Sequence, residues 1–245
     1  MSDIQSYISV ICVVIIIFIV SITLLLYAPK SNNFYDINKY PEIKIVSEML
    51  EFIQNDLEVI IKPENKKASS KWLEYPDKSF IKGECKIYPI YIFDKSYTPG
   101  RVNCKYTYTV YERLKYLLED RYHTSPDTNI IKSCFFMKLG KYSSILKQNN
   151  WADLANNNLR YIVFLKGYEY SNIDICGVWI NGESKHLTNK KMYLCDSSIE
   201  NSIYNDTEED LYLLVIDVLR PDKIPKGVSS RKYTDEVYEC IKKIK

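Results

Sequence analysis

The longest apolar stretch of the chain is Ile8–Ala28, which contains no charged residue. An α-helix rises about 1.5 Å per residue, so a run of this length matches the roughly 30 Å hydrocarbon core of a bilayer. Tyr7 and Tyr27 lie near its two ends, where amphipathic rings favour the membrane interface. The alternative is a cleaved signal peptide, but no basic segment precedes the run and no small-x-small cleavage site follows it. The pattern predicts a transmembrane helix over 7–28, after a tail of residues 1–6.

Helical spacing of apolar residues recurs three times after this run, and each stripe is typical of a helix with one buried face. The first helix is predicted over 42–62, within a connector and lead-in that covers 29–75. The second is predicted over 109–121, and the third in the C-terminal segment 229–245. The third stripe consists of Val237, Cys240, Ile241 and Ile244.

Between and after the first two helices, the pattern changes to short apolar runs separated by turn residues. Strands are predicted at 85–93, 131–138, 159–165, 173–180, 191–195 and 211–218. Asn181-Gly182 follows Trp179-Ile180 and predicts a hairpin turn. Short strands after a helical lead-in predict an α+β fold, with helices packed on a β-sandwich or jelly roll over 76–228.

Composition and charge add little to this picture. The 33 basic and 31 acidic residues leave a net charge of +2, which gives no electrostatic reason to expect nucleic acid as a partner. The chain has only 7 Gly and as many as 22 Tyr, together with many Ile, Asn and Lys. Coding from an AT-rich genome would produce this bias, so it says more about the source than about function.

The side of the membrane on which the remainder lies is left open. Only Asp3 is charged before the predicted span, whereas Lys30, Lys39 and Lys44 follow it, which favours a cytosolic C-terminal part. The sequon that begins at Asn205 would be used only in a secretory lumen, but sequons also arise by chance in Asn-rich chains, so it decides little.

Seven cysteines are present, and Cys12 lies within the predicted span. The even number that remains is compatible with disulfides in an oxidising compartment, and buried free thiols are the alternative. No pair has CxxC spacing, so the sequence predicts no zinc site. The six cysteines after the span are Cys85, Cys104, Cys134, Cys176, Cys195 and Cys240.

A search for catalytic patterns finds no constellation. The two histidines, His123 and His186, fall in predicted loops and neither has a neighbour at metal-ligand spacing. No nucleophile elbow, zinc-protease, P-loop or dinucleotide-binding pattern is present. Glu208-Glu209-Asp210 is typical of a solvated, charged turn.

Three segments of the second half nevertheless share motifs with one known family. Leu159-Arg160 opens a predicted strand, Asp196 and Ser198 lie in a polar block that ends at Asn205, and Leu211–Pro221 forms the last strand. They resemble the L-R-x-H-L, F-D-D-S-x-x-H-x-x-x-N and R-x-x-L-x-x-D-x-x-H-P motifs of the aspartyl/asparaginyl β-hydroxylases. With fainter matches before them, the resemblance covers 42–225.

The resemblance implies a double-stranded β-helix whose mouth holds iron(II), bound by two histidines, and 2-oxoglutarate. In this sequence the first histidine position falls on Trp151, or near Leu146 if a loop has been inserted, and the second falls on Asn201. Ile162 replaces the histidine that contacts the cosubstrate, and Leu211 replaces the arginine that clamps its carboxylate.

An amide oxygen is a much poorer iron(II) donor than imidazole, and a dianion without its bidentate arginine loses charge-assisted hydrogen bonds. The resemblance therefore implies a catalytically inactive member that binds neither metal nor cofactor. The vestigial pocket is predicted to contain Trp151, Arg160, Ile162, Asn201 and Leu211. The framework residues that are kept are Asp196, Ser198, Asn205, Asp217 and Pro221.

The first functional hypothesis is a non-catalytic, membrane-anchored binding or structural protein that contacts another protein. Such a plan, with the AT-rich composition, would fit a membrane component of a large DNA virus. Surface tyrosines would suit protein contacts, because aromatic residues dominate interface hot spots. The alternatives are an active 2-oxoglutarate-dependent peptidyl-Asp/Asn β-hydroxylase with atypical ligands and a lectin-like or peptide-binding module. The tyrosines in question are Tyr168, Tyr170, Tyr193 and Tyr204.

Overall fold

The computed structural model describes residues 15–18, 32–123, 129–168, 175–188 and 191–244. Of the predicted span, residues 15–18 are described and are helical. The rest of the span, like Cys12 and Tyr170, lies outside the described residues. A search of the described ranges finds no helix with the length and apolar character that a bilayer crossing requires.

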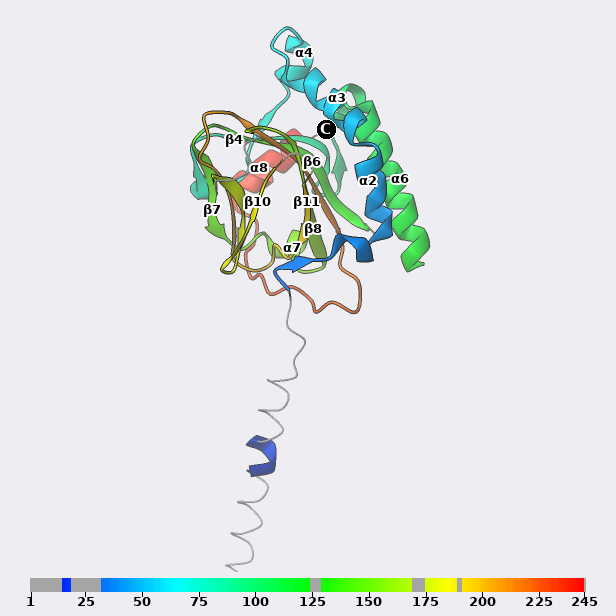
Figure 1. Cartoon of the computed structure of the whole chain (residues 1–245), viewed down its shortest axis with the longest axis vertical. Coiled ribbons are helices and arrows are strands. Elements are labelled where there is room, and N and C mark those ends of the chain that lie inside the picture. Colours follow the sequence, from blue (N-terminus) through cyan, green and yellow to red (C-terminus); the bar gives the residue numbers. More distant parts are fainter. Residues whose placement is uncertain (1–14, 19–31, 124–128, 169–174, 189–190, 245) are drawn as a thin grey trace, which may run out of the picture.

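Two antiparallel sheets form the body of the fold (Figure 1). The larger sheet has the strand order β1-β11-β8-β13-β6-β4-β2, with β5 paired to β4, and the smaller has the order β10-β9-β12-β7-β3. The strands of the larger sheet are β1 Phe34–Tyr35, β2 Leu73–Glu74, β4 Cys85–Ile92, β5 Lys95–Ser96, β6 Ile131–Leu139, β8 Asn158–Lys166, β11 Met192–Cys195 and β13 Leu211–Leu219. Those of the smaller sheet are β3 Ile81–Lys82, β7 Ser143–Gln148, β9 Cys176–Ile180, β10 Glu183–His186 and β12 Asn201–Asn205.

From β6 to β13 the chain alternates between the sheets in the manner of a jelly roll. Strands β6, β8, β11 and β13 lie in the larger sheet, and β7, β9, β10 and β12 lie in the smaller one. This order confirms the predicted α+β fold with a jelly roll. Strands β7 and β12 were not predicted, and β10 was anticipated only as the partner strand of the Asn181-Gly182 hairpin.

Strand β13 shows how the two faces of the larger sheet are used. Leu213 and Val215 point between the sheets, whereas Leu214 and Ile216, one position away, point to the opposite face. Successive side chains of a strand alternate between faces, so an apolar run without polar interruption buries both. We call the cluster between the sheets the inner core and the cluster on the opposite face of the larger sheet the outer core.

Helices cover the outer core (Figure 1). The helix predicted over 42–62 is interrupted at Met49, where φ is −102° and ψ is 11°. Asp56 on the second of its two parts accepts hydrogen bonds from the amide (2.6 Å) and hydroxyl (2.8 Å) of Thr107, in the first turn of the neighbouring long helix. A carboxylate there satisfies an unpaired N–H and faces the positive end of the helix dipole. These three helices are α2 Lys44–Glu48, α3 Leu50–Ile61 and α6 Lys105–Tyr122.

The remaining helical elements are short, and one of them closes the inner core. The C-terminal helix is confined to α8 Asp235–Lys243, while residues 226–234 are irregular. Val237, Cys240 and Ile244 belong to the inner core, and Figure 1 shows α8 behind the space that the two sheets enclose. The other elements are α4 Lys66–Ser69, α5 Thr98–Asn103, α7 Ala152–Ala155 and the 3₁₀ turns η1 Ile37–Lys39, η2 Pro41–Ile43 and η3 Lys78–Phe80.

The six cysteines, for which disulfides and thiols were both left open, are all buried thiols. Burial raises the pKa of the Cys195 thiol to about 12 and raises the pKa of Cys85, Cys104 and Cys134 as well. Because the thiolate is the reactive form, we expect these cysteines to be inert in the folded protein.

This expectation can be measured with a thiol reagent. In native buffer at neutral pH, the six cysteines are expected to react at least 100-fold more slowly than a free thiol, because thiolate fraction and access are both low. Denaturation should release all six at once. Fast labelling of any of them without unfolding would contradict the buried positions.

Candidate functional site

One end of the inner core carries the residues at the predicted metal positions. The last residue of β7, Gln148, lies opposite the first residue of β12, Asn201, in the smaller sheet. Trp151 follows three residues after Gln148, just before α7. We call this end of the jelly roll, marked by Gln148, Trp151 and Asn201, the mouth.

Trp151 is part of a packed aromatic group at the mouth. Its side chain is buried, and its ring stacks on Tyr75 with centroids 6.0 Å apart and meets Phe93 edge to face at 6.0 Å. The guanidinium carbon of Arg231 lies 5.2 Å from the centroid of its ring. Burial raises the pKa of Tyr75 to about 12, so this hydroxyl stays neutral at physiological pH. The position predicted for the first histidine is thus filled by an apolar, tightly surrounded indole.

Asn201 is turned toward its own loop. Its Nδ2 donates hydrogen bonds to the carbonyl oxygens of Ser197 (3.0 Å) and Ile199 (2.8 Å). The amide therefore stabilises the turn between β11 and β12. The side chain at the position predicted for the second histidine therefore has a structural role.

Ile162 and Leu211 are both buried in the inner core, at different distances from the mouth. Ile162 is opposite Val215, two positions from the pairing of Arg160 with Asp217. Leu211 begins β13, six residues before Asp217, which corresponds to ~20 Å along the strand. The structure therefore does not bring Leu211 together with Arg160 in one pocket. Leu146, the alternative to Trp151, is 43% exposed and lies outside the inner core.

Arg160 forms a buried ion pair with Asp217 instead of facing an open cleft. Nε and Nη2 of Arg160 donate to the two carboxylate oxygens of Asp217, both at 2.8 Å, and the hydroxyl of Ser133 donates to Oδ2. The coulombic attraction of Asp217 raises the pKa of Arg160 against the opposing effect of burial. The one arginine kept from the predicted site is thus satisfied within the protein.

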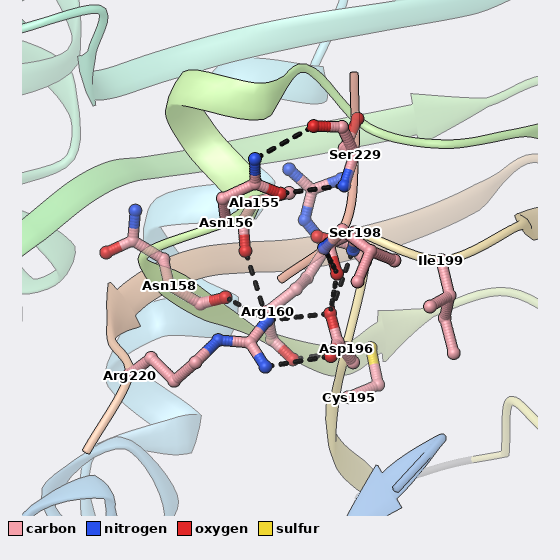
Figure 2. A network of polar contacts seen from close by, with 12 residues as sticks. Ala155, Asn156, Asn158, Arg160, Cys195, Asp196, Ser198, Ile199, Arg220 and Ser229 are labelled. Atoms are coloured by element: carbon pink, nitrogen blue, oxygen red, sulfur yellow. Dashed lines mark hydrogen bonds and ion pairs between the residues drawn. The ribbon is translucent and has the colours of Figure 1, made fainter. Parts of the chain in front are cut away.

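A second buried ion pair joins Asp196 to Arg220 (Figure 2). Arg220 Nη2 and Nη1 lie 2.7 and 2.8 Å from the two oxygens of Asp196, and Asp196 also accepts hydrogen bonds from the amide and hydroxyl of Ser198. Arg220 further donates to the carbonyl oxygens of Ala155 and Asn158. The pair therefore fastens the end of β13 to α7 and to the loop before β12.

Asn205, the last residue of β12, is a polar connection within the fold. Its Nδ2 donates to the carbonyl oxygens of Leu139, Gly140 and Glu209, and its Oδ1 accepts a hydrogen bond from the hydroxyl of Thr207 at 2.7 Å. The side chain is buried. A glycan on Nδ2 would replace one of its two hydrogens and would need space that this buried side chain does not have in the folded domain.

Replacing Asn205 with alanine is expected to lower the free energy of unfolding by about 2–4 kcal/mol, because several buried backbone groups lose their partner. Urea denaturation of Asn205→Ala and of the exposed control Asp206→Ala would measure the difference. A loss below about 0.5 kcal/mol, the range of surface substitutions, would mean that Asn205 is dispensable.

The side chains at the mouth offer few atoms that could ligate iron. Two polar atoms there are buried and lack a hydrogen-bond partner among the described residues, Asn150 Nδ2 and Trp151 Nε1. Both are N–H donors, which offer no lone pair to a cation. Asn150 Oδ1 already accepts a hydrogen bond from the Trp151 amide at 3.0 Å. A search of the described ranges finds no group of three or more His, Cys, Asp or Glu side chains placed to hold a metal ion.

The two histidines and the predicted surface tyrosines are not among the residues that mark the mouth. His123 caps the C-terminus of α6 in the left-handed conformation, with φ of 48°. His186 is the last residue of β10, not a loop residue, and its carbonyl oxygen accepts a hydrogen bond from the Tyr193 hydroxyl. The predicted surface tyrosines Tyr168, Tyr193 and Tyr204 are half-buried.

Five surface cavities are found in the described chain. None of these five is lined by Arg160, Ile162, Asn201 or Leu211.

Sequence reasoning also missed residues that organise the mouth. Asp77 and Arg231 are paired across 154 positions, and no local spacing signals such a pair.

Comparison with known proteins gives one family match and several similar solved structures. A family model described as aspartyl/asparaginyl beta-hydroxylase matches residues 44–221. A search of the curated proteins found no match. Among solved structures, a Pseudomonas putida prolyl-4-hydroxylase is similar at 9% identity and a TM-score of 0.47, covering 70% of this chain and 87% of that one. A predicted oxalate decarboxylase from Thermotoga maritima is similar at 15% identity and a TM-score of 0.37, covering 61% and 93%.

Proposed function

The chain belongs to the aspartyl/asparaginyl β-hydroxylase family, and from this premise we propose that it is a non-catalytic member that acts by binding another protein. Members of the family use iron(II) and 2-oxoglutarate, and two histidines would be needed at the mouth. The observation that carries the proposal is the packing of Trp151 among Tyr75, Phe93 and the Arg231 guanidinium at the first of these positions.

The second position supports the same conclusion. The amide nitrogen of Asn201 is engaged by two backbone carbonyls, and the amide oxygen that remains is a much poorer iron(II) donor than imidazole. Ile162 offers no hydrogen bond to a keto-acid, and Arg160 is already paired with Asp217, so burying a dianion here without a charged partner would be costly. The residues of the mouth therefore do not fit iron(II) or 2-oxoglutarate.

We further propose that residues 7–28 anchor the protein in a membrane and that its partner is a protein. The anchor rests on the uncharged run in the sequence. The partner is supported by exposed aromatic side chains on the helical layer, where Phe52 of α3 and Tyr106 of α6 are 42% and 46% exposed and their rings lie 5.0 Å apart. Extraction of membranes with alkaline carbonate would test the anchor, since a peripheral protein would be released.

The proposal on catalysis is tested with the full chain in detergent or nanodiscs. Titration with iron(II) or manganese(II), with and without 2-oxoglutarate, is expected to show no stoichiometric metal binding and no succinate above the buffer blank. A variant with both His123→Ala and His186→Ala is the control for weak metal binding by exposed imidazoles. Stoichiometric metal that this control retains, together with succinate release, would overturn the proposal in favour of an active hydroxylase with atypical ligands.

A further inference from the structure

The segment that follows the family-matched residues crosses the mouth as an extended peptide. Residues 226–234 have no regular secondary structure. Ser229, Arg231 and Tyr233 are buried or half-buried, whereas Ser230 and Lys232 between them are exposed. Alternation of this kind is typical of an extended chain that lies with one face on a surface. The side chains of Ser229, Arg231 and Tyr233 therefore face the mouth, as those of a peptide bound in a groove would.

The first contact of this segment fixes its backbone. The side-chain amide of Asn156 makes two hydrogen bonds with Ser229, donating to its carbonyl oxygen and accepting from its amide, both at 2.8 Å (Figure 2). The Ser229 hydroxyl donates to the carbonyl oxygen of Asn150 at 2.5 Å. The amide of Ala152 donates to the carbonyl oxygen of Arg231 at 2.8 Å. An amide paired to both backbone groups of one residue recognises a peptide whatever its side chain.

The second contact is a pocket for a guanidinium group. Arg231 Nη2 forms an ion pair with Asp77, and Nη1 donates to the side-chain oxygen of Gln148 and to the carbonyl oxygen of Asn149 at 3.0 Å. Its guanidinium carbon lies 4.4 Å from the ring centroid of Phe80, and the Trp151 ring lies on it as well. A carboxylate, two further acceptors and aromatic faces suit arginine and would not suit the compact charge of lysine equally.

The third contact is an aromatic site for Tyr233. Its ring meets Phe93 edge to face with centroids 5.5 Å apart and meets Trp151 at 5.8 Å. Edge-to-face pairs of this kind contribute about 0.5–1.5 kcal/mol beyond the area that they bury. Trp151 therefore contacts two of the three inward residues.

We propose that the mouth is a peptide-binding groove selective for an extended Ser-x-Arg-x-Tyr segment, and that the chain's own residues 229–233 occupy it. The groove deepens the proposed function by naming the kind of segment that the mouth would bind, and it rests on the same contact of Trp151 with Arg231, together with those of Asn156 and Asp77. A partner that carries the same pattern would have to displace this segment. With the segment in place, the mouth is closed.

The test uses the folded full chain with a protease site inserted between Asp222 and Lys223, which are exposed. After cleavage, a fluorescent peptide covering 223–245 is exchanged into the nicked protein and its dissociation constant is measured by anisotropy. Arg231→Ala in the peptide is expected to weaken binding about 10- to 100-fold, because Asp77 loses its charged partner. Arg231→Lys should also weaken it. The matched control Lys232→Ala, one residue away and exposed, should stay within about twofold.

All peptides carry α8, so its contribution to affinity cancels and the comparison isolates the extended segment. Equal affinities for the Arg231→Ala and Lys232→Ala peptides would overturn the proposal. Loss of near-UV circular dichroism on cleavage, before any fragment leaves, would overturn it too, because the segment would then be core and not ligand. If the nicked protein behaved as expected but the intact one released succinate with iron, the groove would stand and the proposed function would fall.

Discussion

Replacing Asp217 with alanine is expected to lower the free energy of unfolding by about 3–5 kcal/mol. The carboxylate is 1% exposed and pairs with both Nε and Nη2 of Arg160, which is itself buried. Without Asp217, a guanidinium remains in the inner core with no opposite charge. The hydroxyl of Ser133 loses its acceptor as well. Because most domains are stable by only 5–15 kcal/mol, the variant is expected at the edge of folding.

Two further variants separate the effect of the Arg160–Asp217 charges from the effects of side-chain volume and of the Ser133 hydrogen bond. Arg160→Met combined with Asp217→Leu removes both charges and keeps the volume, so it should recover at least half of the loss, since apolar replacement of a buried pair is often neutral or stabilising. Ser133→Ala should cost about 1 kcal/mol, the value of one hydrogen bond. Urea unfolding followed by circular dichroism gives all three values. If Asp217→Ala and Ser133→Ala cost the same, the ion pair has no special weight.

Local sequence pattern was sufficient for strands that are apolar on both faces. β6, β8 and β13 bury the inner and the outer core, so their runs are nearly continuous and were predicted close to their observed bounds. β7 and β12 were missed because polar residues such as Ser144 and Ser202 interrupt their short runs. The break at Met49 carries no signal, because methionine is a good helix former.

The site was harder to predict because its contacts join distant parts of the chain. Trp151 and Asn201 could be aligned to the metal positions, yet nothing in their spacing predicts that Arg231 and Tyr233 lie on Trp151. The predicted pocket assumed an open mouth of the family type. A segment beyond the matched residues fills that mouth, and only the folded structure shows it.

Replacing Arg220 with methionine is expected to cost about 3–5 kcal/mol, a loss comparable to that of Asp217→Ala. The guanidinium has two hydrogen bonds with Asp196 and further ones with the carbonyl oxygens of Ala155, Asn158 and Pro225. Asp196 is fully buried, so the variant would leave its carboxylate without the Arg220 guanidinium, although the amide and hydroxyl of Ser198 would still donate to it. Three backbone carbonyls would lose a donor at the same time.

Lysine at position 220 tests whether charge or geometry matters. A single ammonium group cannot reach both oxygens of Asp196 and three carbonyls, so Arg220→Lys should still cost about 2 kcal/mol even though the charge is kept. The exposed Lys223→Ala in the following turn is the control and should stay within about 0.5 kcal/mol. Since Arg220 also donates to Pro225, just before the segment that closes the mouth, both Arg220 variants should make residues 226–234 exchange amide hydrogens faster. Unchanged exchange there, beside a large loss of stability, would show that the ion pair holds the jelly roll without holding the segment.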